Sequence, residues 1–556
     1  MQFKQTLVRL TFLLSPLSLF SQTTYFNEDA KENVLIERLE IKAQTDSILN
    51  FSKNKPFSRK LIVPHIARMD PKYYTSATDL YNLYSLMADN LEWAQGERKD
   101  YKSNHPWGKH FYQTQANFYE VNTPDFFLVV NPVLQVTAGK ESNNNEMLFQ
   151  NSRGVSIRGR IADKIGFSTY LTDNQERDPL YVQRWVNEHQ AVPGEGYYKF
   201  FKGTGYDYFD ARGYFTFNVA KYIDVAFGYD KNFIGNGYRS LFLSDFSNNT
   251  LFLKLNTRIW KFNYENLFME LTATEPRGPD RLLGKKYATI HHLDLAVTKW
   301  MNVGVMEGVI FGRKDHYEFG YLNPIIFYRS IEQQNGSPDN ALAGLDLKAN
   351  VAHHFQFYSQ FLLDEFVLSE LKANRGWWGN KYGIQLGAKY IDAFHISNLD
   401  LQVEMNRVRP FTYSHDDSIS NYTHYNQPLA HPVGANFQEV IGIARYQPAP
   451  KWTIEAKAIY YYQGKDTGST DFGGNIFLPD KPPYRTSDYG YFVGDGVKTN
   501  VFYGSLFLSY EWKQNFFIEA NAIIRKQQAT GINNPPGETI FSAGIRWNMA
   551  RRKFEW

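Results

Sequence analysis

The sequence of 556 residues contains no cysteine. Disulfide bonds, thiolate metal sites and a lipid anchor on cysteine are therefore excluded, and the fold must be stable without covalent cross-links. The formal net charge is only +3, and charged residues are spread along the chain, so a nucleic-acid partner is not expected. After residue 20 there is no apolar run of helix length, which excludes an ordinary membrane-spanning helix.

Recognisable catalytic motifs are also missing. There is no Gly-x-Ser-x-Gly sequence, and Gly235-Asn-Gly237 lacks the spacing and the following helix of a phosphate-binding loop. His291-His292 and His353-His354 suggest metal pairs, but adjacent strand residues face opposite sides. Asp364-Glu365 could serve glycoside hydrolysis, yet such residues are expected in any polar barrel wall. We expect no enzyme activity, no metal and no cofactor.

Residues 1–21 have the pattern of a secretory signal peptide. Lys4 and Arg9 precede an apolar core at 10–20, which is too short for a membrane span and is interrupted by Pro16. The pattern predicts export of the remaining chain.

Aromatic residues are abundant. The chain has 38 Tyr, 43 Phe and 11 Trp, together 17% of its residues, although its mean hydropathy is −0.47. This combination is unusual for a soluble enzyme. It suits a transmembrane β-barrel, in which only alternate side chains contact lipid and Tyr and Trp line the membrane interfaces.

The clearest alternation lies between residues 214 and 230. In 214–219 and again in 223–230 the odd-numbered residues are apolar and the even-numbered residues are small or carry polar groups. Two such runs across a break at 220–222 predict an antiparallel hairpin. A soluble sandwich could show the same pattern, so the choice depends on the surrounding chain.

Similar alternating runs follow one another from residue 126 to residue 548. There are about eighteen candidates, an even number within the range of bacterial outer-membrane barrels. They are 126–138, 153–162, 164–173, 212–219, 222–230, 249–257, 260–272, 289–298, 302–312, 341–351, 354–364, 378–391, 396–409, 435–446, 451–462, 500–511, 515–526 and 539–548.

The connections between these runs alternate between short and long. Outer-membrane barrels have short periplasmic turns and long outside loops, whereas a sandwich has no reason to sort its loops by length. We therefore predict an all-β transmembrane barrel of about 18 antiparallel strands over 126–548, surrounded by outer-membrane lipid. An even strand number places both termini in the periplasm.

Residues 22–125 differ from the rest. Apolar residues in 33–48 and 78–93 have helical rather than alternating spacing. The prolines at 56, 64 and 71 are expected in the connections. We predict a small, mainly helical N-terminal domain, which would be a soluble periplasmic unit or a plug for the barrel.

The segment 549–556 follows the last predicted strand. It ends in Phe554-Glu-Trp556, which is similar to the aromatic C-terminal signal read by the outer-membrane assembly machinery. Its basic run Arg551-Arg552-Lys553 equally favours a hydrated tail.

Several motifs resemble one known family. They are Asn151-Ser-Arg-Gly154, Tyr170-Leu-Thr-Asp-Asn-Gln-Glu176, Pro193-Gly-Glu-Gly196, Asp210, the long run from Gly228 to Phe246, Tyr321-Leu-Asn-Pro324, Gly336-Ser-Pro-Asp-Asn340, Asp364-Glu365, Val408-Arg-Pro-Phe-Thr-Tyr413 and His431-Pro-Val-Gly-Ala-Asn436. The chain resembles the capsule-assembly (Wzi-like) outer-membrane protein family, in its Bacteroidota, gliding-motility (RemB-like) branch. The resemblance implies a barrel of about eighteen strands, closed from below by a helical bundle and without known catalytic activity. It further implies surface polysaccharide as a partner, or a role in cell-surface motility.

The long loops supply the candidate ligand-binding residues. Their carboxylates, amides, guanidinium groups and aromatic rings suit a sugar polymer, but the same groups could hold the loops in place. In the run from Gly228 to Phe246, the structural interpretation pairs Arg239 with Asp230 or Asp245. The candidates are Asp230, Asn232, Asn236, Tyr238, Arg239, Asp245, Asn323, Arg329, Glu332, Asp339, Asn340, Arg409, Tyr413 and His415. Trp377-Trp378 could stack on sugar rings, although a membrane-interface girdle is the other interpretation.

Three functions remain open at this stage. The first is a non-enzymatic barrel that binds or anchors a surface polysaccharide, or supports surface adhesion or gliding. The second is a porin-like channel, since eighteen strands leave room for an aqueous pore unless something fills it. The third is a subunit of an outer-membrane secretion or motility complex, with the helical domain contacting periplasmic proteins.

Overall fold

The structure, a computed structural model, describes residues 24–94, 98–162, 164–276, 281–314, 316–468, 470–531 and 534–556. The predicted signal peptide lies outside the described residues. In the described ranges no helix is both long enough and apolar enough to cross a membrane.

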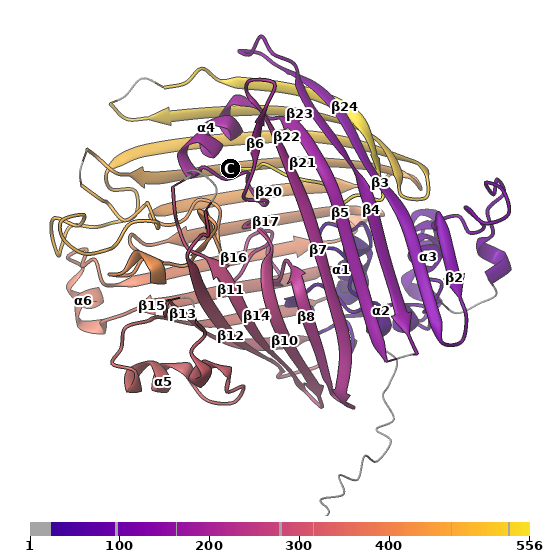
Figure 1. Cartoon of the computed structure of the whole chain (residues 1–556), viewed down its shortest axis with the longest axis horizontal. Helices are drawn as coiled ribbons and strands as arrows, with labels where there is room; N and C mark the ends of the chain where they lie inside the picture. The colour runs from indigo at the N-terminus through magenta and orange to yellow at the C-terminus, as the bar shows by residue number, and fades with distance from the viewer. Residues whose placement is uncertain are drawn as a thin grey trace, which may run out of the picture.

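The main body of the described residues is a closed barrel (Figure 1). Its strands are β3 (Phe126–Glu141), β4 (Leu148–Ile161), β5 (Ile165–Arg177), β7 (Gly205–Ala220), β8 (Ile223–Asp230), β10 (Thr250–Ile259), β11 (Phe262–Thr272), β12 (Lys285–Ala296), β13 (Met301–Phe311), β14 (Asn340–Val351), β15 (Phe355–Glu365), β16 (Lys381–Tyr390), β17 (Leu399–Val408), β20 (Phe437–Tyr446), β21 (Trp452–Lys465), β22 (Val497–Lys513), β23 (Phe516–Ala529) and β24 (Glu538–Trp547). All neighbours pair antiparallel, and β24 pairs with β3 to close the ring. The predicted 18-stranded all-β barrel is confirmed for the described chain.

The remaining elements lie in the N-terminal domain and in the connections. The helices are α1 (Glu32–Ala43), α2 (Arg59–Ile66), α3 (Ala77–Asp89), α4 (Leu180–His189), α5 (Tyr328–Gln334) and α6 (Leu368–Ala373). The short strands are β1 (Asn54–Lys55), β2 (Tyr119–Asn122), β6 (Lys199–Phe201), β9 (Phe233–Ile234), β18 (Thr423–His424) and β19 (Gln427–Pro428). β2 and β6 extend the barrel sheet beside β3 and β7, β1 pairs with β9, and β18 pairs with β19.

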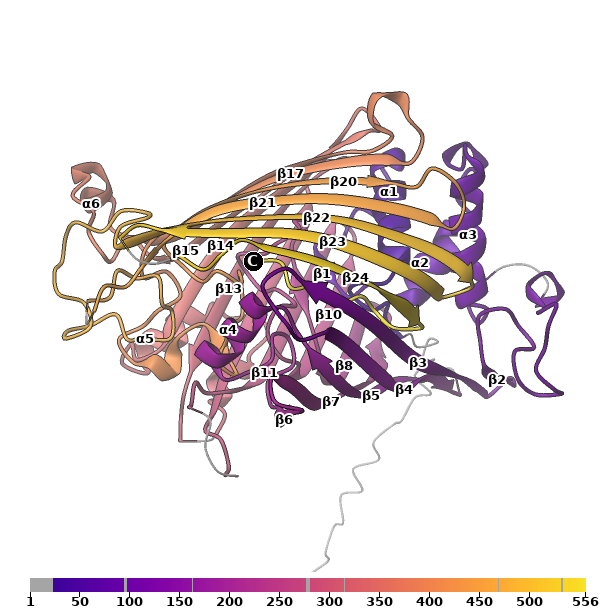
Figure 2. The same ribbon diagram turned by 90° about the horizontal axis from the view of Figure 1, so that it is seen from above.

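The two ends of the barrel differ. One end, here called the turn end, has tight connections such as 221–222 and 514–515, whereas the other, the loop end, has 178–204, 312–339 and 466–496. Seen from above, α5 and α6 gather at the loop end and α1 and α3 at the turn end (Figure 2). The predicted sorting of loop lengths is therefore observed.

The predicted hairpin confirms which side chains face outwards. β7 and β8 pair antiparallel, with Phe215 opposite Phe227 and Thr216 opposite Ala226. Phe215 and Phe227 are 58% and 49% exposed, whereas Thr216 and Ala226 are buried. The apolar face is thus the outer face of the barrel, because side chains alternate along a strand.

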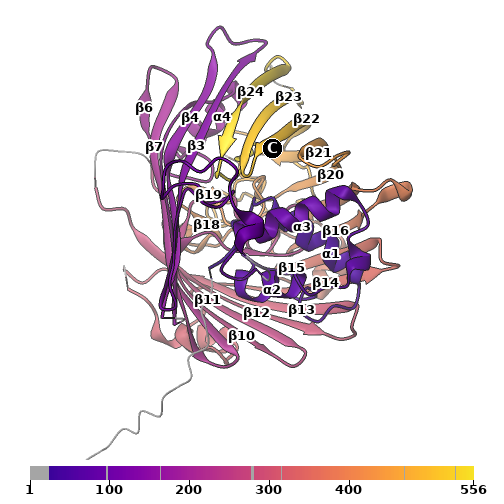
Figure 3. The ribbon, with the colours of Figure 1, turned by 90° about the vertical axis from the view of Figure 1, so that its right-hand side faces the viewer.

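The predicted helical N-terminal segment forms α1–α3, which lie across the turn end of the barrel (Figure 3). α3 begins with a capping box in which Ser76 accepts from the backbone N–H of Asp79 and Asp79 accepts from that of Ser76. One prediction was wrong: Pro64 lies inside α2 rather than in a connection. The buried apolar face of this helix, formed by Ile62, Val63 and Ile66, packs in the core of the domain and outweighs the proline penalty.

Buried ion pairs join the N-terminal domain to the inner wall of the barrel. Lys53 is 1% exposed and forms ion pairs with Asp294 of β12, at 3.1 Å, and with Asp346 of β14. Lys348 of β14 forms an ion pair with Glu40 of α1. Each of these charges would be costly to bury alone. The N-terminal domain and the barrel wall therefore stabilise each other.

The C-terminal segment turns back into the lumen. Glu555 and Trp556 are 3% and 6% exposed, and Lys457 of β21 lies 2.8 Å from the Glu555 carboxylate. Trp556 packs edge-on against Tyr181 of α4. The segment is therefore not a hydrated tail, because acidic partners on the inner wall draw the basic segment inside the barrel.

Replacing Lys53 tests the connection between domain and wall. Lys53→Met should lower the free energy of unfolding by about 3–5 kcal/mol, because it leaves two buried carboxylates without their cation. The measurement is urea unfolding of the purified protein in detergent. Adding Asp294→Asn and Asp346→Asn should restore most of the loss. Lys72→Met, which removes an exposed pair with Asp70, is the control and should change little. An equal loss of unfolding free energy in Lys53→Met and Lys72→Met would refute the connection.

Candidate functional site

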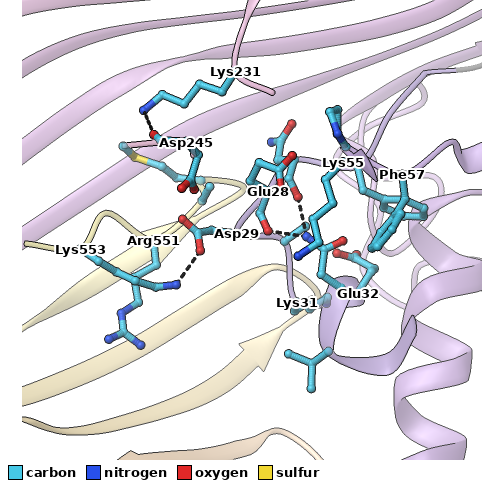
Figure 4. Close-up of a pocket in the computed structure, with 18 of the residues that line it drawn as sticks. Glu28, Asp29, Lys31, Glu32, Lys55, Phe57, Lys231, Asp245, Arg551 and Lys553 are labelled. Atoms are coloured by element: carbon cyan, nitrogen blue, oxygen red, sulfur yellow. Dashed lines mark hydrogen bonds and ion pairs between the residues drawn. The ribbon is translucent and has the colours of Figure 1, made fainter. Parts of the chain in front are cut away.

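The lumen contains a polar chamber with a volume of about 610 Å³. Three segments enclose it together with the inner wall: residues 25–40 of the N-terminal domain, residues 230–246 after β8, and residues 549–554 of the C-terminal segment. Charged side chains of both signs from these segments point into it (Figure 4). Lys553 and Asp29 form an ion pair of 2.5 Å across the chamber and thereby join the two ends of the chain.

The segment after β8 folds into the barrel. Its short strand β9 pairs with β1 of the N-terminal domain, and the backbone N–H of Gly235 donates to the carbonyl of Lys53 at 2.8 Å. Gly235 has φ +150°, and a Cβ there would lie 2.8 Å from the amide of Gln360. A Cβ at Gly237 would lie 2.6 Å from the carboxylate of Glu404. Both glycines are therefore needed for close packing inside the barrel.

Tyr238 and Arg239 hold this segment to the wall and to the C-terminus. Their backbone N–H groups donate to the two carboxylate oxygens of Glu404, at 2.6 and 3.0 Å. The side chains of Tyr238 and Arg239 both bond to Glu555. The ionic partner of Arg239 is Glu439, at 3.5 Å, and not Asp230 or Asp245 as the sequence interpretation proposed.

The other four candidates of this segment have separate roles. Asn236 donates to Ser52 at 2.9 Å, and Asn232 accepts from Lys254 at 2.9 Å. Asp230 caps the next backbone N–H, and the Asp245 carbonyl accepts from the Lys231 ammonium at 2.9 Å. Asp230, Asn236, Tyr238, Arg239 and Asp245 all line the chamber, whereas Asn232 does not. The structure thus brings five of the six together.

The chamber raises the proton affinity of several carboxyl groups outside the strands. Burial raises the pKa of Glu28 to about 8, with Asp245 and Asp29 adding to the effect and Lys55 opposing it. Burial, with Asp89 adding to the effect, raises the pKa of Glu32 to about 7. The chamber therefore gains negative charge between pH 7 and 8.

The candidates of the loop 312–339 lie on the outer wall rather than around the lumen, whereas Asn340 of β14 shares the inward face of Asp346 and Lys348. Asp339 is 3% exposed and bonds to Arg313 and Tyr321, and Asn340 is the first residue of β14. Glu332 is 0% exposed and pairs with Arg329 at 2.9 Å. Their contacts stabilise the loop.

The candidates after β17 also stabilise loops. Arg409 donates to the backbone carbonyls of Asn380, Trp377 and Tyr491, at 2.8–3.2 Å. Tyr413 is 1% exposed and donates to the carbonyl of Leu241. His415 lies 2.8 Å from Asp416. The consecutive histidines 291 and 292 face opposite sides of β12, the first towards Tyr328 and the second towards Asp346.

The structure reveals a surface of which the sequence analysis named only Trp377-Trp378. The connections 366–380 and 466–496 are joined by backbone hydrogen bonds from Gly490 to Arg375, from Tyr491 to Gly376 and from Trp378 to Asp488, at 2.9–3.1 Å. This surface is called the platform here. Its exposed aromatic side chains, each 39–41% exposed, are Tyr484, Tyr489 and Phe492.

A guanidinium group completes the platform. Arg375 lies 4.2 Å above the ring of Tyr489 and donates to both carboxylate oxygens of Glu370. Gly376 has φ +68°, and a Cβ there would lie 2.8 Å from the Phe492 ring. The sequence signal was the density of Tyr and Phe between 484 and 492, but only the structure shows that the loop carrying them pairs with the distant connection 366–380.

No protein-family model and no curated protein sequence matches the chain. Among solved structures, the chain is similar to Wzi of Escherichia coli, an outer-membrane protein involved in group 1 capsule assembly and a carbohydrate-binding β-barrel. The TM-score is 0.57 at 13% identity, over 96% of this chain and 100% of that one. The chain has the fold of Wzi.

Two other solved structures give weaker similarity. OprD of Pseudomonas aeruginosa has a TM-score of 0.41 at 11% identity, over 76% of this chain and 94% of that one. OccAB2 of Acinetobacter baumannii has a TM-score of 0.42 at 8% identity, over 76% and 98%. At these values only the similarity to Wzi bears on the fold, and it extends over the N-terminal segment as well as the barrel.

The raised pKa of Glu28 predicts a pH-dependent stability. A carboxyl group with a raised pKa favours the folded state fully below about pH 4.5, and this contribution is lost as the pH rises through about 8. Glu28→Gln should therefore raise the unfolding temperature at pH 9 by on the order of 1–2 °C and leave it unchanged at pH 5. The measurement is the heat-induced mobility shift of the detergent-solubilised barrel. The exposed Asp125→Asn is the control, and an equal effect at both pH values would contradict the assignment.

Proposed function

We propose that the protein is a non-enzymatic outer-membrane barrel, closed to diffusion, that binds a surface polysaccharide through the platform at its loop end. The single observation that carries the binding proposal is the exposed aromatic surface of the platform, held rigid by hydrogen bonds between two loops.

The outer wall supports insertion in the outer membrane. Large apolar side chains on most strands are exposed on the outside, such as Leu345, Val403, Leu506, Ile524 and Phe541, each at least 53% exposed. A closed ring leaves no unpaired sheet edge, which is the condition for a β-structure in hydrocarbon. Lipid then covers the apolar wall.

The filled lumen argues against an open channel. The N-terminal domain bonds to the wall through Lys53 and Lys348, and the C-terminal segment bonds to it through Lys457 and Arg525. A solute would have to break these buried ion pairs to pass. A closed barrel places its ligand at the loop end, where the platform lies.

The platform has the chemistry for a glycan. Aromatic rings with one exposed face provide flat surfaces for the apolar faces of sugar rings, and the Arg375 guanidinium provides parallel donors for hydroxyl or carboxylate groups. The Arg375–Glu370 pair fixes the guanidinium plane without covering the rings of Tyr484 and Phe492. A surface polymer would bind through several such weak contacts.

Removing the rings tests the proposal. The variant Tyr489→Ala with Phe492→Ala should bind polysaccharide extracted from the source cells about tenfold more weakly, since each stacked ring contributes about 0.5–1.5 kcal/mol. The measurement is binding of the purified protein to immobilised polysaccharide. Trp107→Ala, which removes a ring that is 69% exposed in the N-terminal segment, is the matched control.

Unchanged affinity of the double variant, with its fold intact, would refute the platform as the binding site. Deletion of the gene extends the test to the cell. If surface polysaccharide, adhesion and gliding are all unchanged, a role in polymer anchoring or surface motility is refuted. A stable complex with other outer-membrane proteins in mild detergent would instead support a role in a secretion or motility assembly.

The filled lumen also predicts a low ion conductance. The intact protein in planar bilayers should give no large steady conductance, because the ion pairs of the lumen occupy the path. A porin reconstituted in the same bilayers is the positive control. A large steady current through the intact chain would favour the channel function and contradict a closed barrel.

A further inference from the structure

The connection between β13 and β14, residues 312–339, is called the outer loop here. Val305 of β13 and Leu345 of β14 lie opposite each other and are 47% and 53% exposed, so they mark the outer face of these strands. By alternation Glu307 also faces outwards. The register places His291 opposite Glu307 and Asn266 opposite His291. Three polar side chains therefore lie side by side on the outside of the wall.

These three residues would be costly to expose to lipid. A charged or strongly polar side chain facing the hydrocarbon near mid-membrane costs about 2–4 kcal/mol for a basic residue on a barrel, and less for an acidic one. Glu307 and Asn266 lie near the middle of their strands. The wall at β11–β13 is thus unsuited to lipid unless another part of the chain covers it.

The outer loop provides the cover. The carboxylate of Glu307 accepts from the backbone N–H groups of Tyr328 and Arg329, both at 2.9 Å. The ring of Tyr328 lies 3.9 Å from that of His291. The polar groups of the wall are therefore bonded to the loop.

The contact extends towards the turn end of β11. The carbonyl of Pro324 accepts from Tyr264 and from Asn266, at 2.7 and 3.1 Å. Tyr264 is the third residue of β11 counted from the turn end. The outer loop therefore reaches the middle of the strand on the outside of the barrel.

The loop is fixed by a second set of contacts near its ends. Arg313 and Asp339 form two parallel hydrogen bonds of 2.7 and 2.6 Å, and Tyr321 donates to the same carboxylate. Tyr321 and Tyr328 are buried in an aromatic cluster with Phe311. The loop is thus a packed part of the wall.

The other side of the loop is apolar and exposed. Phe319, Ile325 and Phe327 are 81%, 85% and 76% exposed, more than any outward large apolar residue of the described barrel strands. There is no charged residue from Phe319 to Tyr328, and the flanking residues are Glu318 and Arg329. In water these side chains would be an unusually large apolar protrusion.

We propose that residues 319–328 lie within the hydrocarbon of the outer membrane, with lipid acyl chains covering Phe319, Ile325 and Phe327. The inference rests on the proposed membrane location of the barrel. The loop continues the apolar outer wall, its polar groups bond inwards to the wall, and it reaches mid-strand depth. Irregular backbone at membrane depth is tolerated where its polar groups are satisfied by protein, as the Pro324 carbonyl and the N–H groups of Tyr328 and Arg329 are here.

The absence of cysteine allows a direct test with single spin labels. The Ile325→Cys label is compared with Phe357→Cys on the outer wall and Ser337→Cys at the loop's exposed end, all in the full chain reconstituted in liposomes. The expected result is that the Ile325 label collides often with oxygen, which dissolves in lipid, and rarely with a water-soluble nickel chelate. The Phe357 label should behave in the same way. The Ser337 label should show the reverse.

Two results would overturn the proposal. A label at Ile325 that is open to the nickel chelate would place the segment in water, and one shielded from both reagents would place it against a protein. The Phe357 label separates this failure from that of the proposed membrane location. If the Phe357 label is accessible to the chelate, the barrel is not inserted in the membrane. If only the Ile325 label is accessible, the barrel is inserted and only the outer loop is wrongly placed.

Discussion

The inward-facing charges of the barrel wall must find partners inside the lumen, and the rest of the interior follows from that requirement. Asp294 and Asp346 both form ion pairs with Lys53, and Lys457 forms one with Glu555, so segments from both ends of the chain are drawn in. In a wide barrel of this strand number, water could solvate such charges and leave a pore. Here the chain supplies the counter-charges itself, and burial of each pair makes removal of either partner costly.

Polar side chains on the outer face of the wall also need bonding partners, because lipid cannot solvate them. Glu307 and Asn266 face outwards, and the outer loop satisfies them with backbone N–H groups and a carbonyl before presenting Ile325 and Phe327 to the surroundings. The wall is therefore covered on both sides by other parts of the chain. Inside, the N-terminal domain and the C-terminal segment provide opposite charges for it. Outside, the outer loop covers a polar area of the wall and presents apolar side chains instead.

The strands could be predicted because their signal is local. Phe215 and Thr216 differ in polarity, and alternation alone assigns them to opposite faces. The lumen could not be predicted in this way. Arg552 and Glu176 are 2.7 Å apart but 376 positions apart in the chain, and no local pattern distinguishes a basic tail in water from one facing an acidic wall. The sequence likewise predicts ligand donors at the polar residues of the outer loop, because spacing does not reveal on which side of the wall a loop packs.

The lumen contacts of the C-terminal segment depend on closure of the barrel. The C-terminal segment bonds to Lys457 of β21 and Arg525 of β23, and to Tyr238 of the segment after β8. These groups face a common lumen only when the sheet has curved, and the C-terminal segment comes after β24, whose pairing with β3 closes the ring. Lys553 also pairs with Asp29, so the N-terminal domain must be in place for the last ion pair to form. The last ion pairs of the lumen therefore depend on both the closed ring and the placed N-terminal domain.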